Sequence, residues 1–91
     1  MLPVIWNPEA KADLQTIVEY IAEHSPQAAL AMHDAFVHAA AKLAQHPHLY
    51  RPGRIENTRE LVVHDNYIVV YRVGRTAIEI LSVLHARQQY P

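Results

Sequence analysis

The sequence has no cysteine and only two glycines among its 91 residues. Without cysteine the chain forms no disulfide, no thiolate metal site and no thiol nucleophile. With glycine only at Gly53 and Gly74, a glycine-rich phosphate loop is excluded as well. No apolar run approaches the ~20 residues that span a bilayer, and no basic segment precedes an apolar core at the N-terminus. With 51% of the residues apolar, these absences predict one small cytoplasmic domain over residues 1–91.

Lysine is scarce, and the charges are unevenly divided along the chain. Residues 1–50 contain two lysines against five acidic residues, whereas residues 51–91 contain six arginines against four acidic residues. Every arginine therefore lies in the second half. Because arginine makes planar, bidentate contacts with phosphate and carboxylate, this half is expected to face an acidic partner or a nucleic acid. The alternative is that the arginines only solvate the surface.

The first half reads as a short strand at residues 2–6 followed by two helices. Asn7-Pro8 and Ser25-Pro26 each combine an N-cap residue with proline at the first helical position. His46-Pro47 ends the second helix, because the residue before proline avoids the α region. The short connection favours an antiparallel hairpin. The buried stripe of the second helix is expected at Ala29, Met32, Phe36, Ala39 or Ala40, and Leu43.

A loop is predicted over residues 46–57, and three strands follow at 58–63, at 66–73 and from Ile78 onward. Turns at Asp65-Asn66 and Gly74-Arg75 join them as hairpins. The fold class is therefore predicted as α+β in the order β-α-α-β-β-β, with the helical hairpin on one face of a small, mainly antiparallel, curved sheet. The middle strand is apolar on both faces, so the uncovered face is expected to form a hydrophobic groove for a partner. A curled sheet that covers itself, or a homodimer, is the alternative.

The tail after the last strand carries side chains that could take part in catalysis or binding. His85, Arg87 and Tyr90 follow one another closely, and Arg54 and Arg59 begin the adjacent region of the sheet. An imidazole moves protons near neutral pH, a guanidinium stabilises a phosphate, and a tyrosine stacks on a base. Together they would suit RNA cleavage by attack of a 2′-hydroxyl on the adjacent phosphate.

The structural alternative for the same tail is simpler. His85 and Tyr90 would pack the tail onto the sheet, and Arg87 would pair with Glu79 or another acid. The sequence identifies no second residue that would hold the tautomer of a general base. The seven histidines show no recognised ligand spacing, so neither a metal nor another cofactor is expected.

Several segments taken together resemble the RelE/ParE toxins of type II toxin–antitoxin systems. They are Trp6 in the first strand, the Ala-x-x-Asp-Leu pattern at Ala10–Leu14, Thr58–Leu61, Asn66–Val73 and Leu84–Pro91. The resemblance covers nearly the whole chain and implies the same fold. It also implies a cognate antitoxin whose C-terminal segment wraps the toxin, with operator DNA met only through the antitoxin.

The resemblance implies one of two targets. RelE-like members cut mRNA in the ribosomal A site, whereas ParE-like members act on DNA gyrase and block replication. Binding to ribosomal RNA depends on neutralising phosphates, so the scarcity of lysine favours the ParE-like branch, as does the C-terminal sequence. We therefore expect a non-catalytic toxin that inhibits DNA gyrase.

The residues expected to carry this function form two groups. The tail is expected to contact the target through His85, Arg87, Gln88 and Tyr90. The antitoxin is expected to place acidic groups opposite Arg59, Arg72 and Arg75. One alternative is a metal-independent, ribosome-dependent mRNA endonuclease that uses Arg54, Arg59, His85, Arg87 and Tyr90. The other alternative is a toxin-fold binding module without either activity.

Overall fold

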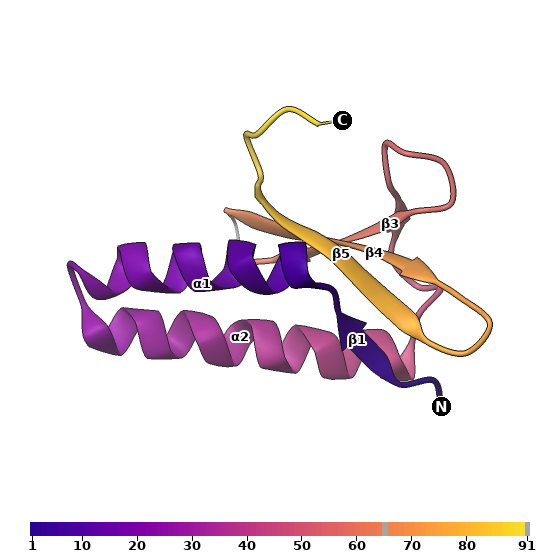
Figure 1. Cartoon of the computed structure of the whole chain (residues 1–91), viewed down its shortest axis with the longest axis horizontal. Coiled ribbons are helices and arrows are strands. Elements are labelled where there is room, and N and C mark those ends of the chain that lie inside the picture. Colours follow the sequence, from indigo (N-terminus) through magenta and orange to yellow (C-terminus); the bar gives the residue numbers. More distant parts are fainter. Residues whose placement is uncertain (65, 91) are drawn as a thin grey trace.

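The computed structural model describes residues 1–64 and 66–90. Its elements, in chain order, are β1 (Val4–Trp6), α1 (Pro8–Ala22), α2 (Pro26–Gln45), β2 (Arg51–Pro52), β3 (Arg59–Val63), β4 (Tyr67–Val73) and β5 (Ile78–His85). Figure 1 shows the two helices running side by side next to the sheet. The predicted order is confirmed, with β2 as one addition inside the segment predicted to be a loop.

Both helices begin where the proline-containing caps predict. The Asn7 side chain accepts the Ala10 N–H at 2.9 Å, and the Ser25 hydroxyl accepts the Ala28 N–H at 3.1 Å. Each bond satisfies a first-turn amide that has no partner inside the helix. The caps therefore fix where the helical hairpin begins and where it turns.

The five strands form one sheet in the order β1-β5-β4-β3-β2. β1 pairs with β5 in parallel, and the other three pairings are antiparallel. A parallel pair requires a long crossover, which the helices and the β2–β4 strands supply. β1 ends at Trp6, opposite Ile80. Beyond Ile80, no strand among residues 1–64 and 66–90 pairs with the outer side of β5.

The core lies between the helical hairpin and one face of the sheet. Phe36 and Leu43 of α2 are fully buried and belong to one apolar cluster with Tyr71 and Ile80 of the sheet. The fully buried Ala10 brings α1 into the same cluster. Of the predicted stripe, four residues are buried, namely Ala29, Phe36, Ala39 and Leu43. Met32 and Ala40 are half-buried and pack against the cluster.

The opposite face of the sheet is not the open groove that the sequence predicts. Ile68 and Val70 point toward this face, yet they are only 3% and 2% exposed. Ile55 and Tyr90 line the same hollow as Val70, so the loop before β3 and the tail cover the middle of the face. Apolar surface remains open toward both edges of this face, at Val62 of β3, which is 48% exposed, and at Ile5 of β1, which is 52% exposed. The prediction failed because it treated the tail as free of the sheet.

The loop prediction for residues 46–57 was wrong at one point. Arg51 and Pro52 form β2 and pair with Glu60 and Arg59. Proline is tolerated there because an edge strand needs hydrogen bonds on one side only. Of the two predicted turns, the one at Gly74 is present, with the Gly74 N–H donating to the Ala77 carbonyl at 2.8 Å. The other falls partly on Asp65, which lies outside the described residues.

Candidate functional site: the tail and its surroundings

The tail folds back from the end of β5 toward the loop before β3 (Figure 1). The Arg54 guanidinium lies over the Tyr90 ring, 4.6 Å from its centroid, and donates from Nη1 to the Tyr90 carbonyl at 3.4 Å. A cation–π contact of this kind is worth about 0.5–1 kcal/mol at an exposed position. We call this Arg54–Tyr90 contact the tail clasp. The clasp confirms that Tyr90 packs the tail onto the protein.

His85 ends β5 with its ring against Tyr67, in an edge-to-face contact of 5.6 Å between centroids. Its Nδ1 accepts the backbone N–H of Arg87 at 3.2 Å. A neutral imidazole has one donor and one acceptor nitrogen. With Nδ1 engaged by the Arg87 N–H, Nε2 is the ring nitrogen left for another partner.

The residues of the alternative catalytic set do not converge. His85 lines a hollow beside α1, together with Ile17 and Tyr20. Tyr90 lines a different hollow, together with Val70 on the opposite face of the sheet. The Tyr90 hydroxyl is buried and makes no hydrogen bond with the described residues. His85 and Tyr90 thus line two adjoining hollows, which share Asp13, Val83 and Gln88.

Arg59 has a structural role in this arrangement. Its register partner is Tyr71, so its side chain lies on the helix side of the sheet. Its Nη1 donates to the carbonyls of His48 at 3.2 Å and Tyr50 at 2.8 Å. These bonds hold the segment between α2 and β2 against the sheet.

Arg72 lies on the other face, where its Nη2 donates to Glu79 Oε1 at 2.6 Å. Glu79 therefore pairs with Arg72 and not with Arg87, which was one alternative from the sequence. Arg87 is exposed, and Arg75 is exposed in the β4–β5 turn. The three arginines predicted to meet the antitoxin thus form no single cluster, because Arg59 faces the helices and Arg72 faces away from them.

Two side chains cap the free edge of β5: Asp13, which the sequence did not identify as a site residue, and Gln88, which was expected only as a target contact. β5 has an open side beyond Ile80, and the outward N–H groups of Val83 and His85 are capped there. Asp13 Oδ2 accepts the Val83 N–H at 2.9 Å, and Gln88 Oε1 accepts the His85 N–H at 3.4 Å. A signal was available for Asp13, because it lies one helical turn from the buried Ala10.

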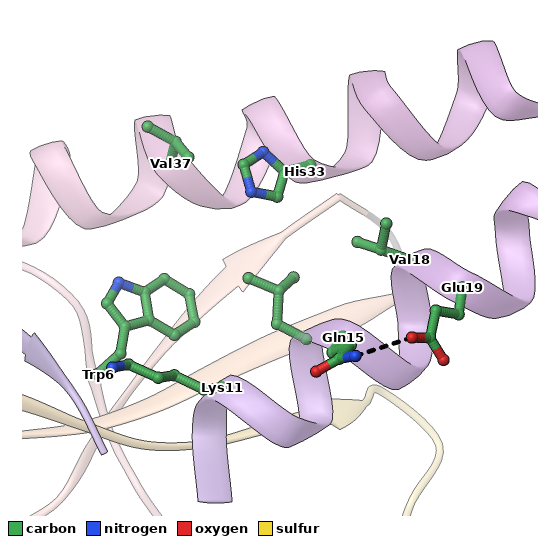
Figure 2. A pocket seen from close by; sticks show the side chains of 8 residues that line it. Trp6, Lys11, Gln15, Val18, Glu19, His33 and Val37 are labelled. Carbon is green, nitrogen blue, oxygen red and sulfur yellow. Dashed lines mark hydrogen bonds between the residues drawn. The ribbon is translucent and has the colours of Figure 1, made fainter. Parts of the chain in front are cut away.

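A separate hollow lies between the helices and was also not predicted (Figure 2). Trp6 of β1 reaches into it, facing Val18 of α1 and Val37 of α2. Val37 is 53% exposed, so the floor is apolar and open. None of the residues proposed from the sequence for target or antitoxin contact lines this hollow. Its rim is polar and includes the Gln15–Glu19 hydrogen bond of 2.9 Å.

Neither a metal centre nor a membrane span is found in the part of the chain that the structure describes. Over residues 1–64 and 66–90, no three histidine, aspartate or glutamate side chains are grouped so that they could hold a metal ion. No helix within the same residues has the length and apolar character needed to cross a membrane.

The fold of this chain has counterparts among known proteins. Residues 4–90 match the family described as the ParE toxin of the type II toxin–antitoxin system parDE. The chain belongs to this family. The ParE family assignment covers every element of the fold, including the tail.

Two sequence relatives of this ParE-family chain carry toxin names. One is Y4kP of Sinorhizobium fredii, named as a toxin, with 44% identity over 94% of this chain and 90% of the relative. The other is toxin RelE2 of Caulobacter vibrioides, with 38% identity over 94% of this chain and 97% of the relative. The second relative is named after RelE, whereas the name of the first indicates neither branch.

Two solved structures share the fold of this ParE-family chain. A chain of the chromosomal ParDE toxin–antitoxin system from P. aeruginosa aligns with a TM-score of 0.82 and 26% identity, over 93% of this chain and 96% of that one. A chain of the RelBE2 complex from Mycobacterium tuberculosis aligns with a TM-score of 0.63 and 24% identity, over 92% and 96%. The second likeness shows the fold alone. The protein is therefore a type II toxin with a cognate antitoxin as its partner.

Proposed function

We propose that this toxin acts by binding DNA gyrase in the cytoplasm, without catalysing RNA cleavage, and that its antitoxin neutralises it by direct binding. The observation that carries the proposal is the state of His85. Its Nδ1 accepts the Arg87 N–H at 3.2 Å, so this nitrogen of the imidazole is already engaged within the tail. A general base must reach the proton that it abstracts with an available lone pair.

The distribution of cations supports the same proposal. An RNA-binding surface gathers several lysines and arginines that neutralise phosphates together. Here Arg51 binds Glu60, Arg59 binds backbone carbonyls and Arg72 binds Glu79. Arg87 and Arg75 are exposed but lie on different segments. The protein thus offers dispersed cations rather than a continuous basic stripe.

One experiment separates the two targets. The toxin is induced alone in cells, and DNA-damage signalling and transcript integrity are followed in the same cultures. Gyrase inhibition predicts filamentation and a damage response with intact transcripts. Codon-phased transcript cleavage would overturn the proposal in favour of the mRNA endonuclease, and His85→Ala should then abolish the cleavage. Growth arrest with neither signature would point to a binding module with a third target.

The tail is the proposed target contact, and the structure sharpens its test. Deleting residues 85–91 removes the last residue of β5 as well as the tail. A deletion that starts at Arg87 preserves β5 and the Ala86 N–H bond to the Asn66 carbonyl. We expect this shorter deletion to abolish toxicity and to leave antitoxin binding through Arg72 and Arg75 largely intact. Full toxicity of the truncated, folded protein would contradict the tail assignment.

The proposed antitoxin contacts at the arginines require different controls. Arg75→Glu changes an exposed turn and is expected to weaken the complex with the antitoxin. Arg72→Glu also creates repulsion with Glu79, so Arg72→Gln is the better probe there. Arg59→Glu removes the bonds to two backbone carbonyls, and any loss of binding must be corrected for the fraction unfolded. Unchanged affinity in Arg75→Glu and Arg72→Gln would place the antitoxin elsewhere.

A further inference from the structure

The tail clasp encloses a hollow between the tail, the sheet and the start of α1. Its floor is apolar and consists of Val70, Leu84 and Ile55. Tyr90 and Gln88 of the tail form one wall. We call this the tail groove. Figure 1 shows the tail arching away from β5 above this region before it approaches the loop before β3.

The end of the tail groove next to α1 is acidic. Glu9 and Asp13 both line it, and their spacing of four residues places them on one face of the helix. Asp13 uses Oδ2 to accept the Val83 N–H, which leaves its second oxygen for another donor. Glu9 is exposed. Two carboxylates therefore face the groove from the same helical turn.

Two buried polar atoms on the same face add to this polarity. In the described part of the chain, Glu60 Oε2 and the Tyr90 hydroxyl are the buried side-chain atoms without a hydrogen-bond partner. Glu60 is 4% exposed and is the register partner of Val70. Its carboxylate consequently lies on the groove side of the sheet. A buried polar atom without a partner costs about 1–3 kcal/mol. Of these two atoms, only the Tyr90 hydroxyl belongs to a residue that lines the tail groove.

Two arginines in or next to the loop before β3 are already engaged. Arg51 binds Glu60 through Oε1, and Arg54 lies over the ring of Tyr90 in the clasp. A ligand that suits the groove would lie along its apolar floor and donate hydrogen bonds to the carboxylates of Glu9 and Asp13. A long aliphatic stem with a charged, multiply donating head has that shape.

We propose that the tail groove receives an arginine side chain from a segment of the antitoxin. The stem would lie along Val70, Leu84 and Ile55, and the guanidinium would meet Glu9 and the second oxygen of Asp13. Arginine suits the site because it presents donors in a planar fork that matches carboxylates. The inference rests on the proposed neutralisation by an antitoxin. The charges are the reverse of those expected from the sequence. Here the toxin supplies the carboxylates and the antitoxin supplies the cation.

The test uses a single side chain as the probe. The full-length toxin, labelled with ¹⁵N, is titrated with N-acetyl-arginine amide and with N-acetyl-citrulline amide, which has nearly the same shape and no charge. We expect the arginine probe to shift the amides of Val83, Leu84 and Gln88, and to bind about tenfold more tightly than the citrulline probe, a difference of 1.4 kcal/mol. Equal binding of both probes would overturn the proposal.

Matched variants of the same helix provide the controls. Glu9→Gln combined with Asp13→Asn keeps an acceptor for the Val83 N–H while removing both charges, and it should abolish the preference for arginine. Glu19→Gln removes one charge farther along α1 and should leave the preference unchanged. Shifts spread over all acidic residues of α1, or a preference that survives the double substitution, would show non-specific charge attraction and overturn the site.

Toxicity is measured in parallel so that the two proposals fail separately. The doubly substituted toxin, induced alone, is expected to arrest growth as the unsubstituted toxin does. Loss of arginine binding with retained toxicity supports the groove as a neutralisation site. Absence of arginine binding to the unsubstituted toxin would dismiss the groove and leave the gyrase proposal to its own test.

Discussion

The Asp13 carboxylate accepts the backbone N–H of Val83 at 2.9 Å, joining α1 to β5 across 70 positions of the sequence. Val83 lies just beyond the point where β1 ends, so its N–H faces outward from the sheet. An unpaired strand edge is a template for unwanted pairing with another chain. The helix thus supplies the hydrogen bond that a missing strand would have made.

Removing this cap should destabilise the fold. Asp13→Ala leaves the Val83 N–H without its acceptor and is expected to lower the free energy of unfolding by about 1–2 kcal/mol. Asp13→Asn retains an amide oxygen and should lose less than half as much. Denaturant titration measures both, and hydrogen exchange at Val83 locates the effect. Equal stability of all three proteins would contradict a stabilising role for the cap.

The Arg51–Glu60 pair joins β2 to β3, with N···O at 2.8 Å. Glu60 is almost fully buried, so Arg51→Met leaves a buried carboxylate without its charge partner. Because the Arg51 side chain is 54% exposed, solvent screens part of the loss, and we expect about 1 kcal/mol of destabilisation. Adding Glu60→Gln should recover part of that loss. A double-mutant cycle without coupling would show that the pair contributes nothing.

Tyr71 predicts a loss of stability in alkaline solution. Its buried hydroxyl donates to the Pro47 carbonyl at 2.7 Å, and burial raises the pKa of Tyr71 to about 12, while the nearby Arg59 charge opposes the rise. In the unfolded chain the same phenol ionises near pH 10. Between these values the unfolded state binds fewer protons than the folded state, so stability falls as pH rises.

The alkaline loss is expected to begin near pH 10 and to reach about 1 kcal/mol by pH 11. Denaturant titrations at pH 8, 10 and 11 measure it. Tyr71→Phe removes the ionisable group but keeps the ring in the core, so its stability should change less over the same range. An equally steep fall in Tyr71→Phe would assign the pH dependence to other groups.

Gly53 has no room for a side chain. A Cβ built at this position overlaps the Thr58 hydroxyl oxygen, and the Gly53 N–H donates to the Thr58 carbonyl at 2.8 Å. Gly53→Ala is therefore expected to cost about 1–3 kcal/mol and to loosen the loop that carries Arg54. Thr58→Ala should relieve part of this cost in the double variant. Gly74→Ala is the milder comparison, because its nearest contact is the Ala77 carbonyl at 3.0 Å.

The helices and the order of elements could be predicted because their signals are local. An N-cap followed by proline acts within one helical turn, and both caps form as predicted. The apolar spacing of α2 likewise identified Phe36 and Leu43 as core residues. Local signals of this kind need no knowledge of the rest of the fold.

The candidate site could not be predicted to the same extent, because it depends on contacts between distant segments. Nothing near Tyr90 in the sequence indicates that Arg54 will lie over its ring, and nothing near Val83 indicates Asp13. β2 was missed for the same reason, since Pro52 becomes a strand residue only through its pairing with Arg59. The residue types of the tail suggested chemistry, and only their placement separates a proton acceptor from a packed side chain.

The parallel pairing of β1 with β5 has a consequence for how this toxin is made. Val4 of β1 pairs with Ile78 of β5, so β1 cannot join the sheet until β5 has been synthesised. Such long-range pairings form slowly because the intervening loop must close first. During translation the sheet stays incomplete until β5 has left the ribosome. The five-stranded sheet therefore cannot form before residues 78–85 have been synthesised.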